Sequence, residues 1–157
     1  NSLWKDRLHL HPVSLQEFAK YNQLQYDVIL SNPPFFISSL KSPDAARNTA
    51  RHTGELLFED ILTFAQQHLT AQGKLYLLLP PPEAAVFQRM AAEHRLYLSE
   101  TLQVFNQTSG KCIRHIQTYT STPAEEPAEK VLHICEADAK TYTADFAALL
   151  KEYYLIF

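Results

Sequence analysis

The residue types that could do chemistry gather in one tetrapeptide, Asn32-Pro33-Pro34-Phe35. The side-chain carbonyl of Asn32 and the backbone carbonyl of Pro33 can both accept hydrogen bonds from one exocyclic amino group. Two such acceptors draw the amine out of conjugation with its ring and make its lone pair available to an electrophile. Phe35 could stack on a flat base, which contributes on the order of 1–3 kcal/mol. The alternative is that Asn-Pro simply marks a turn.

The segment before the tetrapeptide favours the functional interpretation. Tyr26–Ser31 (YDVILS) is a compact apolar run of strand-forming residues. The two prolines must end this strand, because neither can donate to a sheet ladder. In an open α/β sheet, ligands bind beyond the carboxyl ends of the strands, so the tetrapeptide stands where a site is expected.

Apolar runs alternate with helical periodicity along the chain, which predicts an α/β fold. Near-continuous apolar strands fit a mostly parallel sheet with an antiparallel C-terminal part. A long loop is expected at Phe35–Thr53 and a solvated linker at Pro123–Pro127. The expected strands are Arg7–His11, Tyr26–Ser31, Lys74–Leu79, Leu96–Phe105, Cys112–Thr120 and Val131–Cys135, and the expected helices are Leu15–Tyr21, Glu55–Leu69 (followed by Gly73), Glu83–His94 and Thr143–Tyr154.

Composition places the chain among ordinary globular domains. It has 157 residues, of which 46% are hydrophobic and 20% charged, enough for one domain with its own core. No apolar run approaches the roughly 20 residues needed to span a bilayer, so no membrane association is predicted. Two cysteines cannot build a disulfide framework, which favours a cytoplasmic location. The net charge of −3 gives no bulk signal for nucleic acid.

Glycine is scarce, and this bears on cofactor binding. Gly54, Gly73 and Gly110 are the three glycines, and each stands alone. The sequence therefore contains no Gly-x-Gly turn of the kind that cradles a nucleotide.

The stretch YDVILSNPPFF resembles motif IV of class I S-adenosylmethionine-dependent methyltransferases that act on exocyclic or amide nitrogens. Four further segments (WKDRLHLHPVSLQEF, ARHT, GKLYLLLP and KEYYLIF) resemble one branch, the bacterial tRNA (adenine-37-N6)-methyltransferases that modify a valine tRNA. The similarity covers nearly all 157 residues of this chain, but it corresponds to only the second half of the family's sequences. Motif IV is shared with rRNA guanine-N2 and protein-glutamine methyltransferases, so the branch rests on the flanking segments.

The resemblance implies a Rossmann-like class I methyltransferase fold, truncated at the N-terminus. It also implies direct methyl transfer from S-adenosylmethionine to the N6 atom of an adenine in tRNA, without a metal. Asn32 and the carbonyl of Pro33, followed by Pro34, would hold the target amine, and Asn32 is also a candidate contact to the cofactor. Phe35 would lie against the adenine, with Phe36 as a further contact to RNA.

Basic side chains outside the motif are the other candidates for contacts to RNA. Arg47 and Arg51 lie in the expected loop and could meet phosphates, with a solvated loop as the alternative. Arg114 and His115 fall near a turn that could flank the substrate, with a surface position that has no role in binding as the alternative. No metal site is predicted, because no set of ligands with suitable spacing is complete.

Two departures from the family shape further expectations. The family's N-terminal half, with its glycine-rich cofactor loop, is absent, so residues 1–157 are expected to form a single, partial catalytic domain that is inactive alone. Where the family often has an acidic residue near the cofactor's adenine, this sequence places Ser14, a weaker candidate contact. Missing neighbours would leave the strand Asp27–Ser31 with an unpaired edge, which predicts self-association. A non-catalytic interaction module with the same fold is the alternative.

Overall fold

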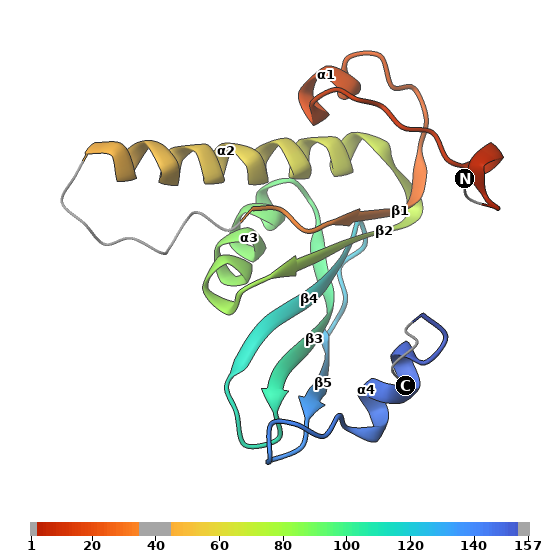
Figure 1. Ribbon diagram of the computed structural model, residues 1–157. Coiled ribbons are helices and arrows are strands. Elements are labelled where there is room, and N and C mark those ends of the chain that lie inside the picture. The colour runs from red at the N-terminus through yellow and green to blue at the C-terminus, as the bar shows by residue number, and fades with distance from the viewer. Residues whose placement is uncertain (1–2, 35–44, 154–157) are drawn as a thin grey trace.

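A five-stranded mixed sheet organises the fold, with its strands in the order β1-β2-β4-β3-β5 (Figure 1). The computed structural model describes residues 3–34 and 45–153, and the side chains of α2 from residue 57 onward. The strands are β1 Tyr26–Ser31, β2 Leu69–Leu79, β3 Tyr97–Gln107, β4 Cys112–Thr120 and β5 Ala128–Cys135. The helices are the 3-10 turn η1 Lys5–Arg7, α1 Leu15–Ala19, α2 Ala45–His68, α3 Pro81–Glu93 and α4 Ala144–Leu150.

The pairing of the strands confirms the expected α/β class and its antiparallel C-terminal part. β1 runs parallel to β2, and β5 runs parallel to β3. β4 lies between β2 and β3 and is antiparallel to both. The described sheet is therefore mixed, with its two parallel pairings at the two ends of the strand order, and the expectation of a mostly parallel sheet is wrong.

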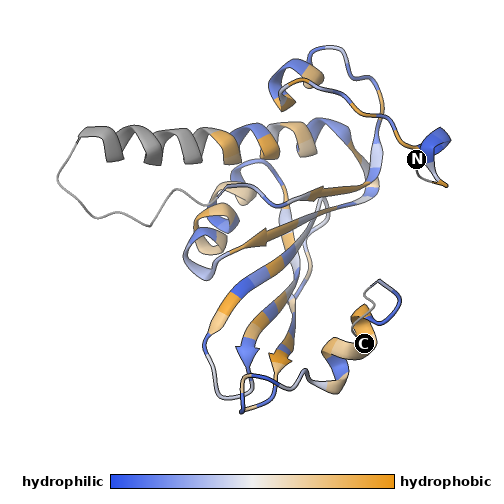
Figure 2. Ribbon diagram, in the orientation of Figure 1, coloured by the Kyte–Doolittle hydropathy of each residue, from blue (hydrophilic) through white to orange (hydrophobic). Residues whose placement is uncertain are grey.

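The core lies between the sheet and helices α2 and α3. Leu75, Leu77 and Leu79 alternate along β2 and bury their side chains completely or nearly so on that face. The ring of Phe87 on α3 packs edge-to-face against Phe58, with ring centroids 5.1 Å apart. Figure 2 shows hydrophobic colour on the later parts of β1 and β2, whereas it alternates with hydrophilic colour along β3 to β5.

The expected strand at Arg7–His11 is wrong. Residues 5–7 form the 3-10 turn η1, and residues 8–11 have no regular structure. A strand needs a neighbour for its backbone N–H and C=O groups, and this segment pairs with none of the described strands. Leu8 and Leu10 are accordingly 64% and 91% exposed.

Helix α2 begins at Ala45, well before the expected Glu55, so residues 45–53 are helical and not part of a loop. Alanine and arginine dominate the start of α2, and both favour helix. Their summed propensity outweighs the cost of Gly54 in the helix interior, about 1 kcal/mol. The remainder of the expected loop, residues 35–44, lies outside the described residues. Helix α4 is shorter than expected and ends at Leu150.

Gly73 lies inside β2 and does not mark the end of α2. Between the pairs Tyr26↔Leu69 and Val28↔Lys74 the register advances two residues along β1 and five along β2, so β2 bulges there. A Cβ atom on Gly73 would lie 2.8 Å from the carbonyl oxygen of Tyr26 and 3.0 Å from the amide nitrogen of Thr70. Both neighbours are backbone atoms, so only glycine fits this close approach.

Among the described residues, no helix combines the length and the apolar character needed to cross a membrane.

Gly73→Ala should destabilise the protein by about 1–3 kcal/mol, because the added methyl group overpacks the contact between β1 and β2. Urea denaturation measures the change. Gln72→Ala is the matched control on the exposed neighbouring position of β2, and it should stay within about 0.5 kcal/mol of the parent. Equal stability of both variants would show that the close approach is not a constraint.

Candidate functional site

Asn32, Pro33 and Pro34 follow the carboxyl end of β1, as predicted. Ser31, the last residue of β1, pairs with Leu77 of the parallel strand β2. Pro33 is buried, whereas its neighbours Asn32 and Pro34 are exposed. The buried Pro33 fixes the chain direction, so the amide of Asn32 starts from a rigid position at the edge of the sheet.

A groove of about 1170 Å³ opens beside Asn32. Its walls come from β1, α1, α2 and the segments on either side of α1. Apolar side chains provide most of the lining, among them Leu15, Phe18, Ile61 and Phe64. A mostly apolar groove with a few polar groups at one end is the usual form of a small-molecule site.

A cluster of aromatic rings holds α1 against α2 and shapes the groove. The Phe18 ring of α1 lies 5.9 Å from Phe64 of α2 and 4.6 Å from His11, measured between ring centroids. Phe64 also packs against Tyr26 at 6.1 Å and against His68 at 4.5 Å. Pairs at these separations add about 0.5–1.5 kcal/mol each beyond area burial. The cluster therefore ties the start of β1 to both helices.

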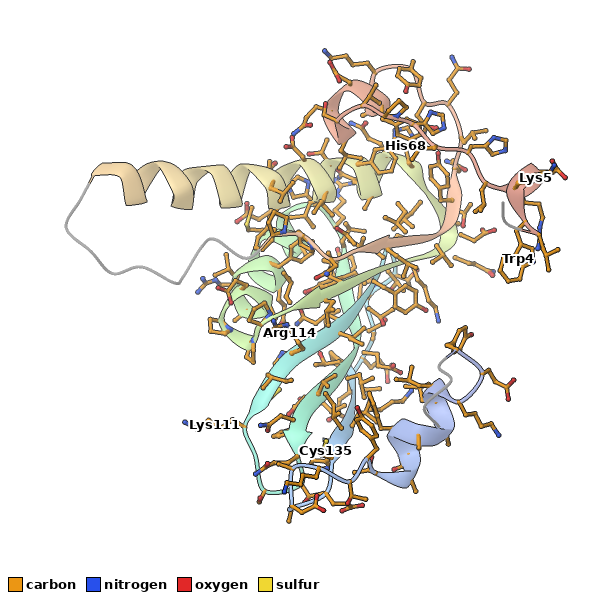
Figure 3. All side chains as sticks on the ribbon, viewed as in Figure 1. Trp4, Lys5, His68, Lys111, Arg114 and Cys135 are labelled. Carbon is orange, nitrogen blue, oxygen red and sulfur yellow. The ribbon has the colours of Figure 1, made fainter. Side chains whose placement is uncertain are left out.

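Hydrogen bonds through Asn22 reinforce this connection. Its Oδ1 accepts from the hydroxyl of Tyr26 at 2.9 Å, and its Nδ2 donates to the carbonyl of Leu24 at 3.0 Å. The same Nδ2 lies 3.0 Å from Nδ1 of His68, at the end of α2 (Figure 3). Asn22 thus links the segment before β1 to α2 and fixes where β1 begins.

Ser14, the candidate cofactor contact, is the N-cap of α1. Its hydroxyl oxygen accepts from the backbone N–H of Glu17 at 3.2 Å, and the Glu17 carboxylate accepts from the Ser14 backbone N–H at 3.3 Å. This reciprocal pair is a capping box. The structure gives Ser14 a role in helix initiation, and its contact with a cofactor stays a prediction.

The structure describes only some of the remaining predicted site residues. Phe35 and Phe36 lie outside the described residues. Arg47 and Arg51 fall within α2, on the part whose side chains are not described. Arg114 lies on β4, and its Nη1 donates to the backbone carbonyl of Ile113 at 2.7 Å.

No group of three or more possible metal ligands occurs among the described histidine, cysteine, aspartate and glutamate side chains. His9 and His11 line the groove without sharing a strand face. Cys112 and Cys135 are free, and the Sγ atom of Cys112 lies 3.4 Å from the carbonyl of Arg114.

Sequence reasoning singled out His115 near a turn but missed the group of polar residues that it forms on β3 and β4. Thr101 pairs with Gln117, and Gln103 pairs with His115, on the sheet face that looks toward α3. Burial lowers the pKa of His115, and the nearby carboxylate of Glu129 opposes this effect. The signal was the spacing of His115 and Gln117, which puts two polar residues on the face that elsewhere is apolar.

The Asn-Pro-Pro segment thus follows the edge strand of a mixed five-stranded sheet, and this arrangement can be compared with solved structures. The chain is similar to the crystal structure of a predicted O-methyltransferase from Agrobacterium tumefaciens, with a TM-score of 0.50 and 16% identity. This likeness covers 80% of the present chain and 51% of the other. It confirms the fold expected from the sequence.

Two curated proteins are similar to the chain over nearly its whole length. The chain is 33% identical over 156 residues to the tRNA1(Val) (adenine(37)-N6)-methyltransferase of Serratia proteamaculans. It is 35% identical over 158 residues to the protein of the same name from Dyadobacter fermentans. Each alignment covers 99% of the chain, so the resemblance stated from the sequence is confirmed.

The chain spans only 60% and 65% of the length of these two curated relatives. No protein-family model matches it.

Ser14→Ala should loosen α1 by about 1 kcal/mol, so the Glu17 backbone amide should exchange its hydrogen about five times faster. Hydrogen exchange followed by NMR measures this. Ser14→Asp keeps a capping oxygen and should restore the protection. Unchanged exchange in Ser14→Ala would show that the cap does not hold the helix.

The stability of the protein should fall as the pH drops through 6.5, the ordinary pKa of histidine. Because burial lowers the pKa of His115 in the folded state, the unfolded chain takes up the proton first, and the full contribution exists only above this pH. Urea unfolding on either side of this pH measures the loss. His115→Gln should show a smaller loss, and equal losses would contradict the assignment.

Proposed function

We propose that this chain carries the acceptor half of a site that methylates the exocyclic N6 of adenine 37 in tRNA. The observation that carries the proposal is the rigid Asn32-Pro33 segment at the carboxyl end of β1, beside the apolar groove. The names of the relatives, tRNA1(Val) (adenine(37)-N6)-methyltransferases, support adenine as the base and tRNA as the partner.

The chemistry asked of the chain is the activation of an amine. Oδ1 of Asn32 and the carbonyl oxygen of Pro33 would accept the two N6–H hydrogens. The nitrogen then loses conjugation with the adenine ring, and its lone pair becomes the nucleophile. No general base is needed, since the proton leaves easily once the nitrogen carries positive charge. S-adenosylmethionine, when bound, supplies the methyl group as an electrophile on a positively charged sulfur.

The described residues fit the reacting end of this cofactor better than its nucleotide end. The groove supplies apolar walls beside Asn32, whereas the sequence offers no Gly-x-Gly turn for a nucleotide. We propose that residues 1–157 form the acceptor part of a catalytic domain and are inactive alone, in line with their share of the relatives' length. Ser14 remains the candidate for a weak additional contact.

Further contacts to the RNA are proposed on the basis of sequence position. Phe35 would stack on the target adenine with Phe36 beside it, and Arg47, Arg51 and Arg114 would meet phosphates. A cytoplasmic location follows from a tRNA substrate and fits the free cysteines.

Self-association through the edge of β1 is also part of the proposal. β1 is the first strand of the described sheet and pairs on one side only, with β2. Val28 and Leu30 are 53% and 74% exposed there. An apolar, unpaired strand edge is a template for pairing with a second copy of the chain.

Asn32→Ala in the full-length protein should abolish methyl transfer to tRNA, since losing one polar partner at the reacting atoms costs about 10²–10³-fold in rate. The affinity for S-adenosylmethionine, measured by calorimetry, should stay nearly unchanged. Asn106→Ala on the exposed end of β3 is the matched control and should keep full activity.

Equal losses of activity and cofactor affinity in Asn32→Ala would contradict the proposed role of the side chain. Full activity of this variant would remove Asn32 from the site and favour a non-catalytic role for the fold.

A further inference from the structure

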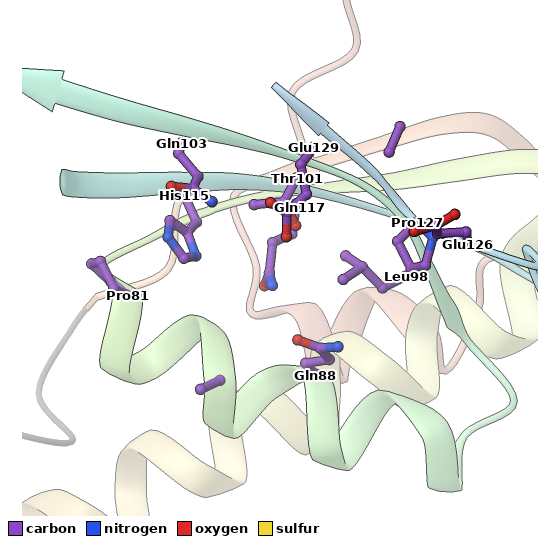
Figure 4. Close-up of a pocket in the computed structure, with 12 residues that line it drawn as sticks. Pro81, Gln88, Leu98, Thr101, Gln103, His115, Gln117, Glu126, Pro127 and Glu129 are labelled. Atoms are coloured by element: carbon purple, nitrogen blue, oxygen red, sulfur yellow. The ribbon is translucent and has the colours of Figure 1, made fainter. Parts of the chain in front are cut away.

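A second cavity of about 850 Å³ lies between α3 and the face of β3 and β4, away from the groove beside Asn32 (Figure 4). Two cross-strand pairs, Thr101↔Gln117 and Gln103↔His115, form its sheet side. Cross-strand partners have Cα atoms about 4.5–5.5 Å apart, so the four polar side chains make one compact group. We call this group the polar quartet.

The polar quartet interrupts an otherwise apolar face. In the register of β2 and β4, Gln117 lies opposite Leu77, and His115 lies opposite Leu79, both core residues. Tyr119, the next residue of β4 on the same face after Gln117, is fully buried in that core. Polar groups on a covered sheet face are costly unless they have hydrogen-bond partners. Their concentration at the cavity therefore needs a reason other than packing.

Gln117 is held as a hydrogen-bond donor to the cavity. Its side chain is almost completely buried, with 2% exposure. The hydroxyl of Tyr119 donates to Oε1 of Gln117 at 2.9 Å, and burial raises the pKa of Tyr119 so that this hydroxyl stays protonated. Nε2 is then left for the cavity, and it has no hydrogen-bond partner among the described residues. Figure 4 shows Gln117 and His115 extending from the sheet toward α3.

The charges around the cavity exclude one class of ligand and favour another. Among the described lining residues there is no lysine or arginine, whereas Glu126 and Glu129 supply carboxylates. Glu129 pairs with Thr101 across β3 and β5, on the same face as the polar quartet. A phosphate or carboxylate would be repelled here. An uncharged, planar ligand that carries an amino group finds both donors and acceptors.

We propose that this cavity binds a nucleobase with an exocyclic amino group, adenine or cytosine, from the RNA that the chain acts on. The amide of Gln103 can contact the amino group and a ring nitrogen of adenine at once, and Nε2 of Gln117 can donate to a ring nitrogen of either base. The carboxylate of Glu129 can accept from the amino group of either base. This inference rests on the proposed function for the identity of the RNA, but not for the chemistry of the cavity.

The cavity is close enough to the motif for both to contact one RNA. Ser31 pairs with Leu77, so the chain after β1 passes beside Leu79, whose partner on β4 is His115. Two strand spacings, roughly 10 Å, therefore separate the Asn32-Pro33 segment from His115. Single-stranded loops present bases that are splayed apart, so a base near the target adenine can enter this cavity with its phosphate outside.

The test is a titration of the full chain with adenosine, cytidine and uridine, observed through the glutamine side-chain amides by ¹⁵N NMR. Adenosine or cytidine should cause saturable shifts of the Gln103 and Gln117 signals, and uridine, which lacks the amino group, should bind about tenfold more weakly. Thr101→Val keeps the shape of the side chain but removes one hydroxyl from the polar quartet, so it should weaken the binding of adenosine and cytidine by about tenfold. Gln66→Leu, on the exposed surface of α2, is the matched control and should change nothing.

Absence of saturable shifts with all three nucleosides, or equal binding by Thr101→Val, would overturn the proposal. A tRNA anticodon hairpin should displace bound cytidine, and failure to do so would overturn the assignment to RNA. The same titration of Asn32→Ala separates the two sites, because nucleoside binding at the polar quartet should survive. The cavity proposal can therefore fail while methylation through Asn32 stands, and the reverse.

Discussion

The parallel pairing of β1 with β2 is the constraint on which the site depends. β1 is short and is hydrogen-bonded on one side only, so its position is set by the contacts of its two ends. At the start, the bulge around Gly73 lets the carbonyl of Tyr26 approach the backbone of β2 closely. At the end, the buried Pro33 stops the ladder and turns the chain. Asn32 lies at this second end, and its place follows from both.

The sheet face that α3 covers holds two different environments, an apolar core and a polar cavity. Near β2 the covered face is filled by leucine and aromatic side chains, which stabilise the fold through burial. On the next two strands, β4 and β3, the polar quartet occupies the same face, where α3 leaves a cavity. Because Tyr119 belongs to the apolar core and also orients Gln117, the core determines how the polar side chain is presented.

Local chemical rules explain which parts of the fold were predictable. The end of β1 was predicted correctly because proline cannot continue a strand, whatever surrounds it. The structure of Arg7–His11 was predicted wrongly, because a strand forms only with a partner strand. The sequence of a segment does not show whether such a partner is present. Gly73 was misread because a glycine after a helix and a glycine at a close backbone approach look alike in a sequence. The placement of Asn32 was predicted, whereas the polar quartet required the register of two strands.

The proposed activation of an amine makes modest demands on the chain, and a short segment is therefore enough for it. Two hydrogen-bond acceptors at fixed positions suffice, and neither an amide nor a backbone carbonyl changes its charge with pH. What the chemistry does require is rigidity, because a misplaced acceptor no longer draws the lone pair out of the ring. The aromatic cluster, the bonds of Asn22 and the close approach at Gly73 all act on the start of β1 or on its pairing with β2. The specific contacts of the fold thus hold the strand that positions Asn32. They do not serve to shift the pKa of a titratable group beside it.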